Sequence, residues 1–321
     1  MARRIRVEYP GAIYHLMNRG DRREAIFRDD EDRQRFIETL GEACHKTGWQ
    51  VHAYCLLPNH FHLVVETPRA NLVAGMKWFL GVYTSRFNRR HKVFGHLFSG
   101  RYKSLIVDGS GTGYLKTVCD YVHLNPVRAR LVKADQRLDV YRWSSYPVYL
   151  HAPSRRPAWL RTKRLLGEWA VPLDSVSGRR MFAAQMEARR CGESDEGFKQ
   201  VRRGWFLGER QFRKELLAQI SQQRGEWHYG EELQESAEER AEELIRTALK
   251  RNGWTEKIMQ ERRKGDAFKV RLAQRLRAGT TLTLRRIAER LSMGTRGHLT
   301  HLLYWYDRKK LVKRKTHTPK M

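Results

Sequence analysis

Two short runs with the alternating pattern of β-strands meet at Pro58 and Asn59, and this junction limits the possible folds more than any other feature of the sequence. Residues 49–57 are typical of one strand and residues 60–66 of the next. Strands joined by so tight a turn pair in antiparallel orientation. We therefore expect an antiparallel sheet in which these two strands are neighbours.

The flanking residues alternate between strand-like and helix-like runs. Residues 12–18 and 103–108 have strand character, whereas residues 30–46, 71–90 and 114–125 have the period of amphipathic helices, the last ending before Pro126. The order strand, helix, strand, strand, helix, strand, helix predicts an α+β fold of the ferredoxin-like (split βαβ, RRM-like) kind. In that arrangement helices cover one face of an antiparallel sheet.

The composition and periodicity of the sequence change after residue 150, and we expect three segments. Residues 1–150 form the α+β domain, and residues 151–205 form a linker and irregular region that begins with a Pro-rich basic stretch. Residues 206–321 have a helical pattern and include a candidate helix-turn-helix at 284–306. Any two amphipathic helices can imitate this motif, so packing against the first domain is the alternative role.

The charge of the chain points to a polyanionic partner. Lys and Arg number 63 against 35 Asp and Glu, which gives a net charge of +28. Nucleic acid is the first partner to consider, a solvated basic surface is the alternative, and membrane binding is disfavoured because the charges are dispersed. Four widely spaced cysteines favour a reducing compartment, and no signal peptide or membrane-spanning run is seen, so a cytoplasmic protein is expected.

A His-x-His pair opens the strand after Pro58-Asn59. Side chains alternate between the faces of a strand, so His60 and His62 share one face while Phe61 and Leu63 lie on the other. Two adjacent imidazoles can act as a bidentate metal ligand. An isolated His-x-His is more often a structural pair with ordinary hydrogen bonds, so its context has to decide.

A second group lies on the last helix of the expected domain. Tyr121 and Asn125 are four residues apart and so are expected on one helical face, where a phenol and an amide oxygen can reach one site. An amide oxygen suits Mg²⁺ or Mn²⁺ as a third ligand. The alternative is that Tyr121 packs in the core and Asn125 closes the helix before Pro126.

Four motifs, in this order, resemble those of one family. The motifs are Leu-Pro-Asn-His-Phe-His-Leu-Val at 57–64, Phe-Ser-Gly-Arg-Tyr-Lys-Ser at 98–104, Tyr-Val-His-Leu-Asn-Pro-Val-Arg-Ala at 121–129 and Trp-Ser-Ser at 143–145. With these motifs the chain resembles the single-tyrosine HUH transposases of the insertion-sequence-200 kind, especially the bacterial REP-associated tyrosine transposases.

The resemblance implies a role for each matching residue. His60, His62 and Asn125 would bind Mg²⁺ or Mn²⁺, although some family members have Gln where this chain has Asn125. Tyr121 would be the nucleophile that forms a 5′-phosphotyrosine, with Tyr114, two helical turns earlier, as the alternative. The implied substrate is single-stranded DNA at hairpin or palindromic repeats, and the implied assembly is a monomer or a homodimer.

Further residues are candidates for contacts with DNA. Trp78, Tyr83 and Tyr102 are expected either to stack on unpaired bases or to pack in the core. Two alternative functions remain: a domesticated, non-catalytic DNA-binding regulator, and a replication-initiation or relaxase nickase. The expected DNA-contacting side chains are Arg101 and Lys103 in the first domain and Arg296, His298, Thr300 and His301 on the second helix of the helix-turn-helix.

Overall fold

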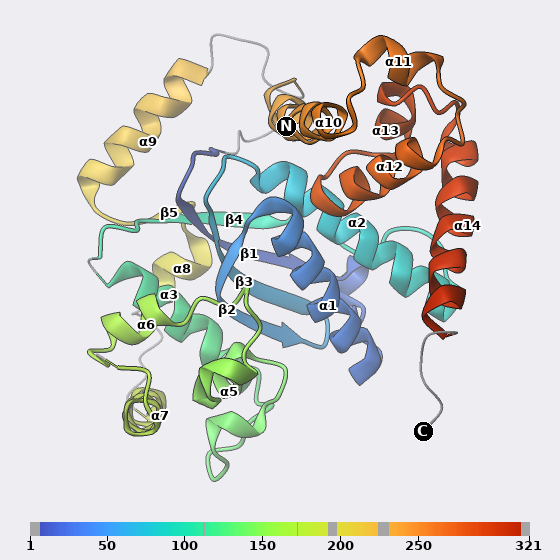
Figure 1. Ribbon diagram of the computed structural model, residues 1–321. Helices are drawn as coiled ribbons and strands as arrows, with labels where there is room; N and C mark the ends of the chain where they lie inside the picture. Colours follow the sequence, from blue (N-terminus) through green and yellow to red (C-terminus); the bar gives the residue numbers. More distant parts are fainter. Residues whose placement is uncertain (1–6, 112, 172, 192–197, 224–230, 316–321) are drawn as a thin grey trace. The chain divides into compact units, whose positions relative to one another are not determined.

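The computed structural model describes residues 7–111, 113–171, 173–191, 198–223 and 231–315, and the chain divides into two compact units, residues 1–228 and 229–321. Figure 1 shows the sheet and helices of the first unit and the all-helical second unit. Within the described residues, no helix is both long and apolar enough to cross a membrane.

A five-stranded mixed sheet forms the framework of the first unit, with the strand order β2-β3-β1-β4-β5. The hairpin expected at Pro58-Asn59 is present, with Leu57 opposite His60, and β1 pairs antiparallel with both β3 and β4. The fifth strand pairs parallel with β4 and was not predicted, because two residues are too few to show a period. The strands are β1 Ala12–Arg19, β2 Gln50–Leu57, β3 His60–Thr67, β4 Lys103–Val107 and β5 Phe206–Leu207.

Helices cover both faces of this sheet (Figure 1), and not one face as the sequence predicts. On one face, Phe36 of α1 (Asp30–Thr47) and Phe79 of α2 (Leu72–His91) pack on Phe61 of β3, with ring centroids 5.0 and 6.4 Å from that of Phe61. On the other face, α3 (Tyr114–His123) brings Tyr121 against the histidines of β1 and β3. Because side chains alternate between the two faces along β3, Phe61 packs in an aromatic core on one face and the histidines lie on the other.

Residues 151–205 differ from the irregular linker expected there. Their described part contains α-helices, and side chains such as Phe182 and Phe198 are buried in the same core as the sheet. These helices could not be recognised in the sequence, because Gly and polar residues interrupt their amphipathic period. The remaining helices of the first unit are α4 Asn125–Arg128, α5 Ser145–Leu150, α6 Lys163–Glu168, α7 Val176–Cys191, α8 Lys199–Arg203 and α9 Arg210–Gln223, with 3-10 turns at Asp21–Arg23, Leu138–Val140 and Pro153–Arg155.

The second unit begins later than the expected boundary at residue 206, because β5 belongs to the sheet of the first unit and the division falls at residues 228 and 229. It has a separate core that includes Ile245, Leu276 and Ile287. The two helices expected at 284–306 are present, and the second is longer than expected. The helices are α10 Glu231–Asn252, α11 Glu256–Glu261, α12 Ala267–Gly279, α13 Leu284–Arg290 and α14 Arg296–Lys315.

Candidate functional site

His60 and His62 lie on the face of β3 that α3 covers. Their ring centroids are 5.2 Å apart, and the rings are steeply inclined at 75°. His62 is buried, with 2% of its surface exposed, whereas His60 at the start of the strand is partly exposed. Burial lowers the pKa of His60 to about 4 and, together with nearby positive groups, lowers the pKa of His62 well below its usual value. Both imidazoles are therefore neutral near pH 7, which is the form that binds metals.

A third histidine, His15 on β1, completes the cluster. Its Nε2 lies 2.9 Å from Nδ1 of His62, and the two rings are nearly parallel at 12° with centroids 5.2 Å apart. Burial lowers the pKa of His15 to about 4. His15 does not stand out in the sequence, because only the register between β1 and β3 brings it to His62. The available signal was a histidine in the middle of the largely apolar run of residues 12–17.

The hydrogen bonds of the two strand histidines determine which ring nitrogen can face a ligand. Nδ1 of His60 lies 2.7 Å from Oδ1 of Asn59, an atom that can only accept, so Nδ1 carries the proton and Nε2 keeps its lone pair. The amide of Asn59 is oriented in turn by a 3.1 Å bond from Nδ2 to the carbonyl of Arg23. Since Nδ1 of His62 is occupied by His15, Nε2 is the ligand atom that both histidines have to offer.

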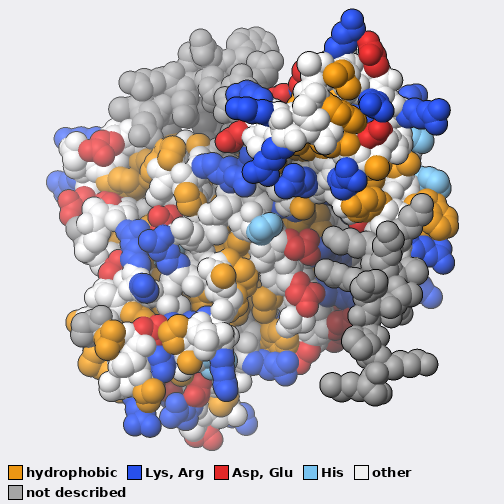
Figure 2. Space-filling model, viewed as in Figure 1, with side chains coloured by type: hydrophobic (Ala, Val, Ile, Leu, Met, Phe, Trp, Pro, Cys, Tyr) orange, Lys and Arg blue, Asp and Glu red, His pale blue; other side chains and the backbone are white. Residues whose placement is uncertain are grey.

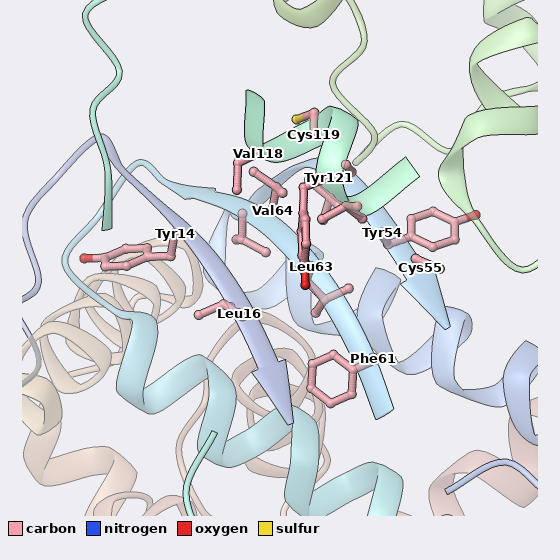
Figure 3. Close-up of a cluster of buried hydrophobic side chains, with 14 of the residues drawn as sticks. Tyr14, Leu16, Tyr54, Cys55, Phe61, Leu63, Val64, Val118, Cys119 and Tyr121 are labelled. Carbon is pink, nitrogen blue, oxygen red and sulfur yellow. The ribbon is translucent and has the colours of Figure 1, made fainter. Parts of the chain in front are cut away.

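Tyr121 projects from α3 onto this cluster. Its ring centroid lies 5.6 Å from those of His62 and His15, in edge-on contact with both rings. Figure 3 shows the Tyr121 side chain extending from the helix towards the strands. The ring is 8% exposed, so only a small part of it is accessible to solvent. The structure thus brings together three of the residues singled out in the sequence: His60, His62 and Tyr121.

Arg128 packs against the ring of Tyr121. Its guanidinium carbon lies 4.5 Å from the centroid of Tyr121 and 4.3 Å from that of Phe198, and its Nη1 donates to the backbone carbonyl of Tyr121 at 2.9 Å. A cation over aromatic faces is attractive. The same charge contributes to the lowered pKa of His62. Arg128 is therefore a second residue at the site whose role the sequence pattern does not indicate.

Asn125 and Tyr114 are placed differently from His60, His62 and Tyr121. The helix α3 ends at His123 because Pro126 cannot continue its hydrogen bonding, and Asn125 begins the short helix α4 instead of sharing one regular helix with Tyr121. Nδ2 of Asn125 donates to the carbonyl of Tyr121 at 2.9 Å. Among the described residues, no hydrogen bond joins Asn125 to either strand histidine, and no ring contact joins Tyr114 to the cluster.

The donor set is compatible with a divalent ion without defining a complete site. Two neutral imidazoles that use Nδ1 for hydrogen bonds can bind such an ion through Nε2, and the buried amide of Asn125 lies on the next helix. In the described part of the chain, no group of three or more His, Cys, Asp or Glu side chains has the arrangement of a metal site. Oxygen ligands from an amide and from a substrate would have to complete the coordination.

Two motif residues near the cluster have structural roles. The hydroxyl of Ser145 lies 2.8 Å from Nε2 of His123 and within 2.9 and 3.2 Å of the backbone nitrogen and oxygen of Tyr54. The carbonyl of Trp143 accepts a 2.9 Å bond from the nitrogen of Leu56, which extends the pairing at the β2 edge. His123 is fully buried, and burial lowers its pKa to about 3. These residues fasten α3 and α5 to β2.

The expected DNA-contacting side chains are mostly at the surface of their own unit. Arg101 and Lys103 are exposed before and at the start of β4, whereas Tyr83 is 1% exposed and donates to the carbonyl of Ile26, so Tyr83 is a core residue and cannot stack on a base. In the view of Figure 2, Lys and Arg side chains are spread over the first unit among acidic ones. In the second unit, the exposed residues at the start of α14 are Arg296, His298, Thr300 and His301.

The histidine cluster and Tyr121 lie in a part of the chain that matches a known family model. Residues 8–125 match the family model described as "Transposase IS200 like", a span that includes His15, His60, His62, Tyr121 and Asn125. No curated protein matches the chain. A solved structure described as "Structure of the REP associates tyrosine transposase bound to a REP hairpin" is similar at 15% identity, covering 51% of this chain and 93% of that chain with a TM-score of 0.40.

Proposed function

We propose that this chain, whose residues 8–125 match the IS200-like transposase family, cleaves and rejoins single-stranded DNA through a covalent bond to Tyr121. The observation that carries this proposal is the contact of the Tyr121 ring with His62 and His15, 5.6 Å from each. A nucleophile has to stand beside the groups that orient the scissile phosphate. The excess of basic residues suits a DNA substrate.

The proposed reaction conserves the energy of the phosphodiester bond. The phenolic oxygen of Tyr121 attacks the phosphorus, its proton is lost to a base or solvent, and the 3′ oxygen of the preceding nucleotide leaves and takes up a proton. The products are a 5′-phosphotyrosine and a free 3′ hydroxyl, and attack by a 3′ hydroxyl on the phosphotyrosine restores the phosphodiester. Transposition of a strand follows when the second hydroxyl belongs to a different site.

The residues around Tyr121 supply positioning and charge. His60 and His62 would hold Mg²⁺ or Mn²⁺ through Nε2, with Asn125 as the proposed third ligand, and the chemistry that such an ion supplies is polarisation of a phosphate oxygen. His15 fixes the ring of His62, and Arg128 holds the Tyr121 ring and adds positive charge beside it. We further interpret the first four strands as the ferredoxin-like framework that carries this site.

The proposed substrate is unpaired DNA beside a hairpin or palindromic repeat, as in REP-associated transposases. The second unit is proposed to contact duplex DNA through the first turns of α14, where Arg296, His298 and His301 are exposed. Its helices α13 and α14 are joined by a turn in which Ser292 and Gly294 have left-handed φ angles of 51° and 86°.

Incubation with labelled hairpin DNA and Mn²⁺ tests the proposal. We expect cleavage by the native chain, none by His62→Ala, and full activity of His45→Ala, an exposed histidine on α1 that serves as the matched control. DNA binding without cleavage under any divalent metal would instead support a regulator that acts through the second unit.

A further inference from the structure

A cavity of about 370 Å³ lies within the second unit, between α10, α12 and α14. This volume is within the range of small-molecule pockets, roughly 300–1,000 Å³. Three arginines line it: Arg251 near the end of α10, and Arg271 and Arg275 one turn apart on α12. No Asp or Glu is among its described lining residues.

The three guanidinium groups of this cavity are not neutralised within the described part of the unit. None of them forms an ion pair with a described carboxylate, whereas Arg290 in the same unit bonds both Glu242 and Glu256. Three cations around one hollow repel one another, and a bound anion relieves that repulsion. Charge alone therefore favours an anionic occupant.

The remaining walls of the cavity add flat apolar surface and amide groups. Tyr306 of α14 and Phe268 of α12 are half-buried there, and Phe268 is held by Trp254 with ring centroids 4.5 Å apart. Asn252 and Gln274 also line the cavity, and the amide of Gln274 donates to the carboxylate of Asp307. Arginines that bind phosphates, combined with aromatic rings that stack on bases, form the usual binding surface for unpaired nucleic acid.

We propose that this cavity binds one unpaired nucleotide of a DNA strand, with its phosphate on the three arginines and its base against Tyr306. A hollow of this size encloses a single base, whereas the phosphates of a duplex form a ridge that is better met by an exposed helix face. This inference rests on the proposed function for its DNA partner. It assigns to the second unit a contact with the unpaired strand, in addition to the duplex contact proposed for α14.

The test compares two triple variants of the full chain. Arg251→Gln/Arg271→Gln/Arg275→Gln removes the cavity cations, and the control Lys257→Gln/Arg263→Gln/Lys264→Gln removes three exposed cations of the same unit outside the cavity. Binding to a fluorescent hairpin with a short oligo-dT tail, and to the same hairpin without a tail, is measured by anisotropy at several salt concentrations. Thermal melting checks that both variants are folded.

We expect the two variants to differ in DNA affinity only when the hairpin has a tail. For the tailed hairpin we expect the cavity variant to bind about tenfold more weakly than the control, with a salt slope smaller by about 0.7 for each phosphate that the arginines no longer neutralise. For the blunt hairpin the two variants should bind alike. Equal binding of the tailed hairpin, or an equal weakening with both hairpins, would overturn the inference.

Two further experiments distinguish binding of the base from binding of the phosphate, and binding of a DNA strand from binding of a free nucleotide. Tyr306→Ala should weaken binding of the tailed hairpin but have no effect when the tail is abasic, and an equal weakening with the abasic tail contradicts base stacking. Competition by free dTMP with no contribution from the tail would identify a free-nucleotide site and overturn the strand assignment. A native chain that binds no DNA overturns the proposed function as well, whereas insensitivity to the arginines overturns this inference alone.

Discussion

Nε2 of His15 lies 2.9 Å from Nδ1 of His62, so a residue of β1 occupies one ring nitrogen of a histidine on β3. When the proton of this bond belongs to His62, its Nε2 keeps the lone pair that a metal requires. Partners that bind the second nitrogen of a ligating histidine fix both its tautomer and its orientation. His15 is therefore a positioning residue in the proposed site.

Replacement of His15 by Phe should weaken metal binding while the fold is retained. The phenyl ring keeps the stacking on His62 but cannot accept its proton, so we expect the affinity for Mn²⁺ to fall about 10- to 100-fold. Isothermal titration calorimetry measures this affinity, and His45→Phe on the surface of α1 is the control. An unchanged Mn²⁺ affinity in His15→Phe would show that this bond has no role in metal binding.

Ser145→Ala should destabilise the first unit without acting on the chemistry. The substitution leaves His123 and the backbone of Tyr54 without their shared partner in a buried environment, which costs about 1–3 kcal/mol. Urea denaturation measures the change in the free energy of unfolding. The control Ser85→Ala, at an exposed position of α2, should leave the unfolding free energy nearly unchanged. A cleavage rate that falls at a temperature where Ser145→Ala is fully folded would contradict a purely structural role.

Asp120 should make the stability of the first unit depend on pH. Burial raises the pKa of this carboxyl to about 7, against the opposing effects of its bond from Trp169 and the charges of Arg189 and Lys116. A raised pKa in the folded state means that the folded chain holds the proton more tightly. The resulting stability is present below the ordinary pKa of Asp and is lost as the pH rises towards 7.

Denaturation at pH 4 to 8 compares the native chain with Asp120→Asn. Across the window from about pH 4 to 7, the unfolding free energy of the native chain should fall relative to Asp120→Asn by up to about 1.4 kcal/mol per pH unit. The amide cannot ionise, so the variant lacks this component of the pH dependence. Parallel pH profiles for the two chains would show that Asp120 is ionised equally in the folded and unfolded states.

The sheet could be predicted from the sequence because its signals are local. The turn at Pro58-Asn59 and the alternation of residues 60–66 defined the hairpin and the shared face of His60 and His62. The contact of His15 with His62 depends on strand register across 47 residues, which alternation alone does not specify. The four-residue spacing predicts one helix for Tyr121 and Asn125, but Pro126 divides that segment into α3 and α4.

The packing of residues 151–205 could not be predicted for a different reason. Phe182 and Phe198 contribute to the core through a segment that has no sustained amphipathic period, so only tertiary contacts reveal them. The guanidinium of Arg128 packs against the rings of both Phe198 and Tyr121, so this segment contacts the proposed site. A truncation at residue 150 would remove that support from the Tyr121 side chain.

The central claim is that Tyr121 forms a covalent bond with DNA. The direct measurement is peptide mapping by mass spectrometry after incubation with hairpin DNA and Mn²⁺, comparing the native chain with Tyr121→Phe and with Tyr114→Phe. We predict a nucleotide adduct on the peptide that contains Tyr121, its loss in Tyr121→Phe and its persistence in Tyr114→Phe. An adduct that remains in Tyr121→Phe, or that maps to Tyr114, would contradict the proposed mechanism.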